Sequence, residues 1–364
     1  MRWLAGALLL ACGACSPLSR RCPVVALAGA TPHSVEGAVA SAVLSADRGG
    51  RAVCIQVFRH PSYDSVGDPA AEVAMAERVA AQDDVMVVVG HATSGGSLAA
   101  APVYRTAGLA QLVPAATSRL LAQFRPSAMS LAPDDSLEGQ ALAAYGAETL
   151  HAHRAFVFYV ANEYAEGLLG GLKLGLAGRQ VVIAATARIL SESDLPTLVD
   201  AAIRRRQADV AYLIGDYRTV GRLAQVIHAR RLTMPLVAGD AALYPEGLAE
   251  QAGDALPSLR VVGFRRQGAD SARSAVYLAA FRRIAGREPT PDEMLTHDAL
   301  MVAVAAVRAV GPDRAAVESW LASLGGSRPA WRGVTGPVEF AHPAAARFGV
   351  FRIQDDSAVP VTPR

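Results

Sequence analysis

The stretch VMVVVGHATSGGS, residues 85–97, decides the fold of this chain. Its first five residues are apolar and mostly β-branched, as in a strand that is covered on both faces of a parallel sheet. A turn rich in Gly and Ser follows directly, and an apolar helical pattern runs from Leu98 to Ala107. A buried strand, a small-residue turn and a helix together predict one unit of an α/β fold.

The same alternation continues along the chain in both directions. Apolar runs predict further strands at residues 24–28, 52–58, 110–113, 155–160, 181–186, 210–214, 235–238 and 259–262, with helical patterns at 71–81, 137–150, 195–206 and 217–231. Polar segments interrupt the alternation at Ser130–Asp135 and Gly263–Asp270. Because 364 residues are too many for one hydrophobic core, we predict two α/β lobes joined near these interruptions.

Local patterns add detail at three places. Asp135–Glu138 and Thr290–Glu293 have the spacing of capping boxes and predict the first turns of two helices. Near the end of the chain, Gly336–Phe340 and Arg347–Ile353 are typical of short strands, and we predict that they pair antiparallel.

The first residues are typical of an export signal. Met1–Cys12 has one positive charge and an apolar run shorter than the ~20 residues of a membrane-spanning helix. Leu9–Cys12 resembles a bacterial lipobox, in which the cysteine becomes the lipidated first residue. Cys15 is a second candidate, and ordinary signal cleavage is the alternative. We predict a signal peptide and lipoprotein tether over residues 1–21, acylation at Cys12, and a periplasmic or cell-surface location.

Two further cysteines lie at the beginnings of the first two predicted strands. Cys22 lies just before the strand at 24–28, and Cys54 lies at the start of the second apolar run. The first two strands of a doubly wound sheet are neighbours, so a disulfide is sterically allowed in an oxidising compartment. Two separate thiols are the alternative.

Charge and motifs argue against several function classes. The 35 basic and 33 acidic residues leave a net charge of +2 without a dense basic run, so we expect no nucleic-acid partner. The sequence has no G-x-S-x-G, H-E-x-x-H, Walker or paired C-x-x-C motif, and we predict no enzymatic activity, cofactor or metal site. His151 and His153 form an isolated H-x-H, which we interpret as a solvated pair.

Two turns are candidates for binding an anion. Residues 90–97 follow one predicted strand, and residues 113–118 (VPAATS) end the next. Backbone N–H groups at the start of the helix near Leu98, together with the Ser94 hydroxyl, would hold a carboxylate at the carboxyl edge of the sheet. Two ordinary strand-to-helix turns are the alternative interpretation.

These turns resemble those of the type I periplasmic binding proteins, in particular the Leu/Ile/Val-binding proteins of bacterial ABC importers. VVGHATS (88–94) and QLVPAAT (111–117) resemble the first-lobe turns of that family. Further matching segments are NEYAEG (162–167), which resembles the turn after the first strand of the family's second lobe, and, later in the chain, AGD (238–240), THDA (296–299) and GVTGPVEF (333–340). The matches occur in the family's order from about Val24 to Ile353.

The resemblance implies two Rossmann-like lobes, the type I periplasmic-binding-protein fold, with three crossovers and a ligand cleft between the lobes. The crossovers would lie near Ala132–Asp135, Gly263–Gly268 and Gly325–Val334. Lobe 1 would then comprise residues 22–132 and 268–325, and lobe 2 would comprise residues 133–267 and 326–364.

The resemblance also implies roles for five residues. Ser94, Ala115 and Thr117 would surround a ligand carboxylate, Tyr164 would close over the ligand, and Asp240 would pair with its ammonium group. The protein would be a monomeric receptor that captures a small solute, an amino acid or related carboxylate, by hinge closure. It would deliver this solute to ABC permease and ATPase components while anchored to the membrane by its lipid.

Two alternatives remain open at this point. The same fold serves as a ligand-sensing ectodomain that acts with a separate signalling partner. The first strand-to-helix turn is also shortened to Gly29–Ser34. In the second lobe the Gly-Tyr-type turn reads Gly215-Asp216-Tyr217, and the sequence does not decide which of Asp216 and Tyr217 faces the cleft. These departures leave room for a larger, less polar solute.

Overall fold

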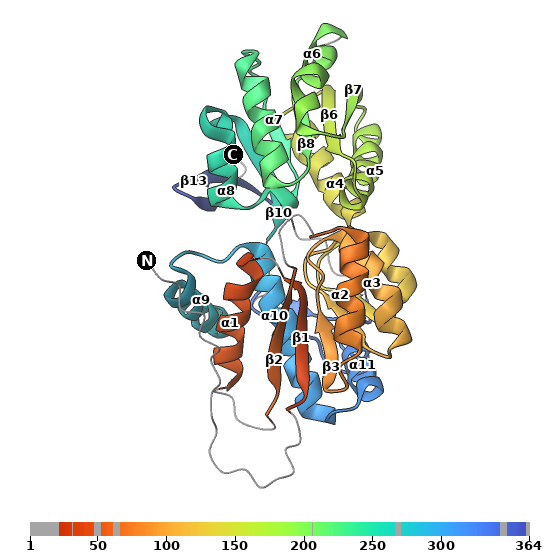
Figure 1. Ribbon diagram of the computed structural model, residues 1–364. Helices are drawn as coiled ribbons and strands as arrows, with labels where there is room; N and C mark the ends of the chain where they lie inside the picture. Colours follow the sequence, from red (N-terminus) through yellow and green to blue (C-terminus); the bar gives the residue numbers. More distant parts are fainter. Residues whose placement is uncertain are drawn as a thin grey trace.

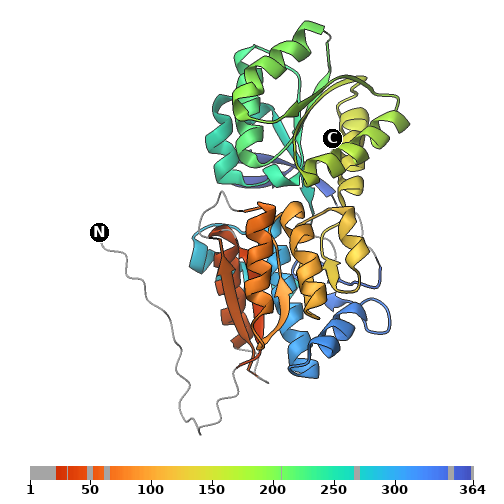
Figure 2. The same cartoon turned by 45° about the vertical axis from the view of Figure 1, so that its right-hand side comes forward.

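The computed structural model describes residues 22–30, 32–46, 52–60, 66–205, 207–265, 271–342 and 348–361. They form two α/β lobes, one above the other in Figure 1, and the lobes remain separate when the view is turned in Figure 2. The two-lobed α/β architecture predicted from the sequence is therefore confirmed. Cys12 and the rest of residues 1–21 lie outside the described residues.

The first lobe is built on a five-stranded parallel sheet with the order β2-β1-β3-β4-β5. Its strands are β1 (Val24–Ala30), β2 (Cys54–Arg59), β3 (Val85–Val89), β4 (Ala110–Val113) and β5 (Ala128–Ser130). Its helices are α1 (Pro32–Ala46), α2 (Pro69–Ala80), α3 (Ser94–Thr106), α9 (Ser271–Ala285), α10 (Pro291–Val310) and α11 (Arg314–Ala322), with a 3-10 helix, η2, at Arg119–Phe124.

Both faces of the sheet are covered at its central strands, which explains why β1 and β3 are apolar and buried throughout, whereas the edge strand β2 is partly exposed. Val25 and Leu27 of β1 pack on one side in a core with α10 and α11. Val24 and Ala26 point to the opposite side, where α2 and α3 cover them. Figure 1 shows these two helix layers on either side of the strands.

The second lobe is built on a seven-stranded sheet with the order β14-β13-β10-β9-β8-β6-β7. Its strands are β6 (Arg154–Val160), β7 (Val182–Ile189), β8 (Val210–Ile214), β9 (Leu236–Ala238), β10 (Leu259–Phe264), β13 (Phe348–Gln354) and β14 (Ser357–Pro360). Its helices are α4 (Asp135–Ala144), α5 (Glu163–Gly178), α6 (Leu195–Arg205), α7 (Tyr217–Ala229) and α8 (Pro245–Ala252). A π-helical turn at Tyr145–Thr149 and 3-10 turns at Glu192–Asp194 (η4), Asp240–Ala242 (η5) and Gly253–Ser258 (η6) complete it.

The C-terminal strands pair differently from the prediction. Residues of β13 pair antiparallel with β10 and with β14, so they extend the second sheet rather than pairing with Gly336–Phe340. Instead, β12 (Pro337–Val338) forms a small ribbon with β11 (Trp331–Arg332). The predicted antiparallel pair is therefore wrong, because the partner of β13 lies more than 80 positions earlier in the chain.

The same region corrects a lobe boundary. Val338 and Phe340 are buried in the core of the first lobe, and Trp331 packs against it. The Asp298 carboxylate in α10 also accepts the backbone N–H groups of Val334 and Thr335, at 2.7 and 2.9 Å. Residues 331–340 therefore belong with the first lobe. The third crossover lies between Phe340 and Phe348, not at Gly325–Val334.

The two predicted capping boxes have different outcomes. At α10, Thr290 and Glu293 form the reciprocal box. At α4, however, the N-cap is Asp134, whose side chain accepts the N–H groups of Ser136 and Leu137 at 2.9 and 3.2 Å. The predicted N-cap is therefore one residue too late. Because Asp134 is the N-cap, Asp135 and Glu138 do not form a capping box.

The structure also contains a disulfide between the first two strands. Cys22 and Cys54 form a disulfide with a Cα–Cα distance of 5.8 Å, and it joins the starts of the neighbouring strands β1 and β2. Among the described residues, no helix is both long and apolar enough to cross a membrane.

Candidate functional site

Two adjoining cavities lie between the lobes, with volumes of about 330 Å³ and 240 Å³. We call them together the cleft. The larger cavity is lined by all five predicted site residues, which are Ser94, Ala115, Thr117, Tyr164 and Asp240. The smaller cavity shares Ala115 and Asp240 with it. The structure thus brings together, at one place, residues that the sequence separates by up to 146 positions.

The first-lobe wall of the cleft is made by the turns after β3 and β4. Thr93 caps α3, its hydroxyl accepting the N–H of Gly96 at 3.0 Å. The helix therefore begins at Ser94, four residues before the predicted start at Leu98. The N–H groups of a first helical turn have no partner within the helix, and Ser94 and Gly95 line the cavity. This wall offers donors to an anion, as at other helix N-termini.

Gly90 allows the turn after β3 to pass close to the neighbouring strand. Its φ is +132°, and a Cβ atom at this position would overlap the carbonyl oxygen of Ala28 in β1. Only glycine is compatible with both requirements. The Gly-rich composition of this turn therefore reflects close backbone packing as well as the shape of the cavity wall.

The second-lobe wall is made by the start of α5 and the turn after β9. Tyr164 lies in the first turn of α5, which Asn162 caps through the N–H of Ala165 at 2.9 Å. The Tyr164 hydroxyl is buried, and it has no hydrogen-bond partner among the described residues. Asp240 begins the 3-10 turn that follows β9 and faces the cleft.

Glu138 is the residue of this wall that the sequence analysis missed. Its Oε1 accepts the backbone N–H of Asp240 at 2.7 Å, and its Oε2 is buried without a hydrogen-bond partner among the described residues. Burial raises the pKa of Glu138 well above its ordinary value, and the nearby Asp240 charge raises it further. Burial likewise raises the pKa of Asp240. The two carboxyls therefore retain protons more readily than exposed acids do.

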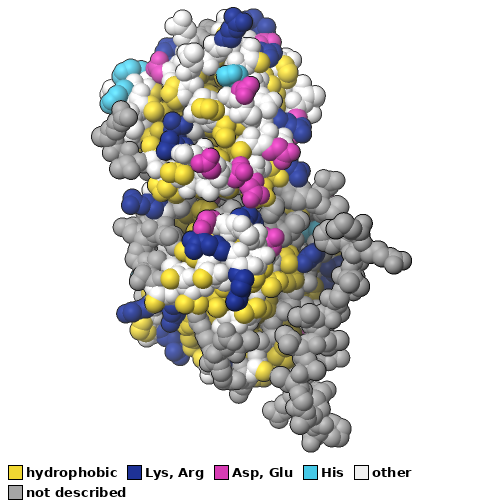
Figure 3. Space-filling model, turned by 90° about the vertical axis from the view of Figure 1, so that its left-hand side faces the viewer, with side chains coloured by type: hydrophobic (Ala, Val, Ile, Leu, Met, Phe, Trp, Pro, Cys, Tyr) yellow, Lys and Arg dark blue, Asp and Glu magenta, His cyan; other side chains and the backbone are white. Residues whose placement is uncertain are grey.

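Further acids surround the same space. Asp292, at the start of α10, lines both cavities and is exposed to solvent there; the lobes on either side and the Asp240 charge raise its pKa. Asp216 also lines both cavities. None of the described residues lining the cleft is Lys or Arg. Figure 3 shows acidic side chains gathered where the second lobe faces the first. The cleft therefore favours a ligand with a cationic group.

Asp216 and Tyr217 both line the smaller cavity, which answers the question that the sequence left open. Asp216 also caps α7, accepting the N–H of Thr219 at 2.9 Å. The ring of Tyr217 packs against that of Tyr244, with 4.9 Å between their centroids. These two rings give the acidic cleft an apolar end.

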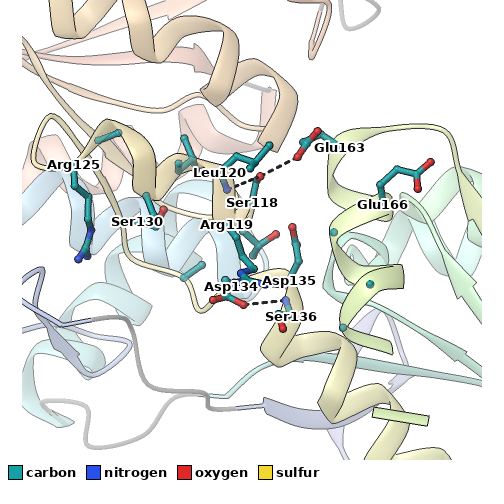
Figure 4. A pocket seen from close by; sticks show the side chains of 18 of the residues that line it. Ser118, Arg119, Leu120, Arg125, Ser130, Asp134, Asp135, Ser136, Glu163 and Glu166 are labelled. Atoms are coloured by element: carbon teal, nitrogen blue, oxygen red, sulfur yellow. Dashed lines mark hydrogen bonds between the residues drawn. The ribbon is translucent and has the colours of Figure 1, made fainter. Parts of the chain in front are cut away.

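A larger and more open cavity, of about 820 Å³, flanks the first crossover (Figure 4). Ser118 and Glu163 face each other across it, and the Ser118 hydroxyl donates to Glu163 Oε1 at 3.2 Å, which links the lobes directly. Asp135 also lines this cavity. Its carboxyl is buried without a hydrogen-bond partner among the described residues, and burial raises its pKa to about 8.

The sequence of this chain matches the family model for periplasmic binding proteins over residues 26–358. It belongs to the periplasmic binding protein family. This assigns the chain to solute-binding proteins rather than enzymes, as the sequence predicted. The leucine-specific-binding protein of Salmonella typhimurium is 27% identical over 216 residues, which cover 59% of this chain and 58% of that protein. The match thus spans little more than half the length of this relative.

Solved structures confirm the fold of this periplasmic binding protein. A branched-chain amino acid transporter substrate binding protein from Streptococcus pneumoniae, solved with isoleucine, superposes with a TM-score of 0.79 at 18% identity, covering 94% of this chain and 100% of that one. A solute binding protein from R. palustris, solved with benzoate, gives 0.78 at 17% identity and covers 94% of this chain and 96% of that one. At these identities the likeness concerns the fold alone.

Proposed function

We propose that this protein is an exported receptor that captures a small zwitterionic solute, an α-amino acid in the first instance, between its two lobes. The observation that carries the proposal is the chemistry of the cleft walls. Ser94 and Thr117 lie on one wall beside the start of α3, and Asp240 lies on the opposite wall. An amino acid presents a carboxylate at one side and an ammonium group at the other, and these walls complement both.

The size of the cleft supports a small ligand. The larger cavity, at about 330 Å³, is near the lower end of the range for small-molecule sites, and the adjoining cavity of about 240 Å³ provides space for a side chain. The rings of Tyr217 and Tyr244 lie at that end. We therefore place the ligand's carboxylate at Ser94 and Thr117, its ammonium group at Asp240, and its side chain toward the tyrosines.

A panel of amino acids and analogues tests this function. Thermal shift measurements with the twenty amino acids would identify a ligand, and a ligand at a hundred times its Kd stabilises the folded state by about 2.7 kcal/mol. With L-leucine as the first probe, isothermal titration would then compare its Kd with the Kd values of two analogues. These are 4-methylpentanoate, which lacks the amine, and 3-methylbutylamine, which lacks the carboxylate. We expect both analogues to bind at least thirtyfold more weakly. Equal binding of 4-methylpentanoate would contradict the role of Asp240.

Hinge closure is part of the proposal. The three connections between the lobes allow them to approach each other around a ligand, and closure excludes water from the charged groups. Small-angle scattering should show a smaller radius of gyration with the bound amino acid than without it. An unchanged radius with a ligand verified by titration would contradict closure.

Export and delivery complete the proposal. The Cys22–Cys54 disulfide suits an oxidising compartment outside the cytoplasm. We propose that the chain is acylated at Cys12, acts as a monomer at the membrane surface and passes its solute to the permease of an ABC importer. The relatives' names support the transport role, since they include a leucine-specific-binding protein and a branched-chain amino acid transporter component.

A further inference from the structure

Three ligand-type side chains meet beneath the cleft in the first lobe. His60 follows β2, Glu72 belongs to α2, and His91 follows β3. Glu72 Oε2 lies 2.8 Å from His60 Nε2 and also contacts His91 Nδ1. One ligand atom from each of the three lies within 4.8 Å of the others. The side chains of Glu72 and His91 are fully buried, and that of His60 is 3% exposed.

Neighbouring groups hold two of these side chains in place. His91 Nε2 lies 2.8 Å from the buried hydroxyl of Tyr104, which fixes the ring so that Nδ1 faces the carboxylate. Glu72 Oε1 accepts the backbone N–H of Gly67 at 2.8 Å, which leaves Oε2 directed at the two imidazoles. Metal-binding histidines and carboxylates in proteins are oriented by such outer hydrogen bonds.

The backbone approaches the cluster closely at two glycines. A Cβ atom at Gly96 would lie 2.7 Å from Glu72 Oε1, and one at Gly29 would lie 2.9 Å from His91 Nδ1. Gly29 and His91 also line the smaller cavity of the cleft. The cluster is therefore tightly enclosed by backbone, and His91 borders the cleft.

The carboxylate of Glu72 is fully buried. Within the described residues, the groups that hydrogen-bond to this carboxylate carry no fixed positive charge. A buried carboxylate is stable only when it is paired with a cation or coordinates a metal.

We propose that His60, Glu72 and His91 bind a divalent transition-metal ion, Zn²⁺ in the first instance. Two imidazole nitrogens and one carboxylate oxygen are a ligand set that zinc uses, with a fourth position left for water. Around tetrahedral Zn²⁺ the ligand atoms are about 3.3 Å apart, so the side chains need to move by little more than 1 Å. The ion would tie the end of β2, helix α2 and the end of β3 together under the cleft.

This site revises the expectation that the chain has no metal ligands. The three residues are separated by 12 and 19 positions, which is not a spacing that any short metal motif has, and only the fold brings them together. The inference is independent of the proposed solute, because the groups that hold the solute's carboxylate and ammonium, Ser94, Thr117 and Asp240, do not belong to the metal site.

Metal titration of untagged protein tests the proposal. A Cys12→Ser/Cys15→Ser background removes the two N-terminal thiols, which would otherwise bind metal. After treatment with EDTA, isothermal titration with ZnCl₂ at pH 7.5 should show one ion per chain with a Kd in the micromolar range or below. His60→Ala, at the edge of the cluster, should weaken binding at least tenfold.

Two further measurements make the test specific. The double variant His151→Asn/His153→Ala removes the exposed H-x-H pair and should leave the Zn²⁺ affinity unchanged. Asn is chosen at position 151 because it adopts the positive φ of His151 readily. Co²⁺ bound to the parent should give the visible absorption of a four-coordinate site, which Glu72→Gln should lose. Absence of stoichiometric binding, an unchanged Kd in His60→Ala, or loss of binding in the H-x-H variant would each overturn the proposal.

Discussion

The role of Asp240 can be tested by the isosteric change Asp240→Asn. In the proposed complex its carboxylate pairs with the ligand ammonium away from bulk water, and truncating one partner of such a pair costs ~2–5 kcal/mol. The buried, unpartnered Oε2 of Glu138 lies close by and would compensate in part. We therefore expect the low end, about 2–3 kcal/mol, which is a roughly 30- to 150-fold weaker Kd.

Isothermal titration with L-leucine, or with the tightest-binding amino acid of the panel, measures this change. Ser94→Ala removes one hydrogen-bond donor of several and should cost only ~1–2 kcal/mol. Asp254→Ala changes an exposed acid of the same lobe and should leave the Kd unchanged. If Glu138 compensates, Asp240→Asn combined with Glu138→Gln should cost more than the sum of the single changes. Binding by Asp240→Asn within threefold of the parent would refute the reasoning.

The same pair predicts a pH dependence of binding. In the free protein, burial raises the pKa values of Asp240 and Glu138, so that these carboxyls retain protons at higher pH than usual. An ammonium ligand stabilises the ionised form, so binding releases protons. The affinity should therefore rise with pH through this raised range, and the binding enthalpy should depend on the ionisation enthalpy of the buffer. A Kd that is constant from pH 6 to pH 9 would contradict this coupling.

Further predictions concern stability and location. Asp134→Ala removes the cap of α4 and should destabilise the fold by about 1 kcal/mol in thermal melts. Asp135→Asn should stabilise the fold more at pH 8 than at pH 5, because the raised folded-state pKa of Asp135 makes its contribution increasingly unfavourable as pH rises from about 4 to 8. Equal effects of Asp134→Ala and Asp135→Asn would contradict the assignment of Asp134 as the cap. Cys54→Ala opens a disulfide loop of 32 residues and should cost ~3–4 kcal/mol in denaturant unfolding, relative to the parent under the same oxidising conditions. Cys12→Ala should abolish palmitate labelling and release the protein from membrane fractions, and labelling lost only in Cys15→Ala would move the anchor.

The elements that the sequence predicted best are the buried central strands. For Val85–Val89, Ala110–Val113 and Val210–Ile214 the predicted and observed bounds agree, because uninterrupted apolar runs are required where helices cover both faces of a sheet. The three-residue β5 at Ala128–Ser130 was missed, since so short a run has no distinguishing pattern. The pairing of β13 with β10 was also missed, since it depends on partners far apart in the chain.

In the candidate site, too, the sequence predicted the residues that follow strands and missed those that only folding brings together. Ser94, Thr117 and Asp240 lie in turns directly after strands, where parallel sheets place their binding residues, and all three line the cleft. Glu138 has a capping-box spacing that pointed to a local role, yet its carboxylate binds the N–H of Asp240, 102 positions away. His60 likewise gave no signal, because its neighbours Glu72 and His91 are brought to it only by folding.

A crystal structure with the bound amino acid tests the central claim most directly. The account predicts a closed cleft, with the ligand carboxylate within hydrogen-bonding distance of Ser94 and Thr117 and the ligand ammonium within about 3 Å of an Asp240 carboxylate oxygen. A ligand bound outside the cleft, or one whose carboxylate faces Asp240, would contradict it.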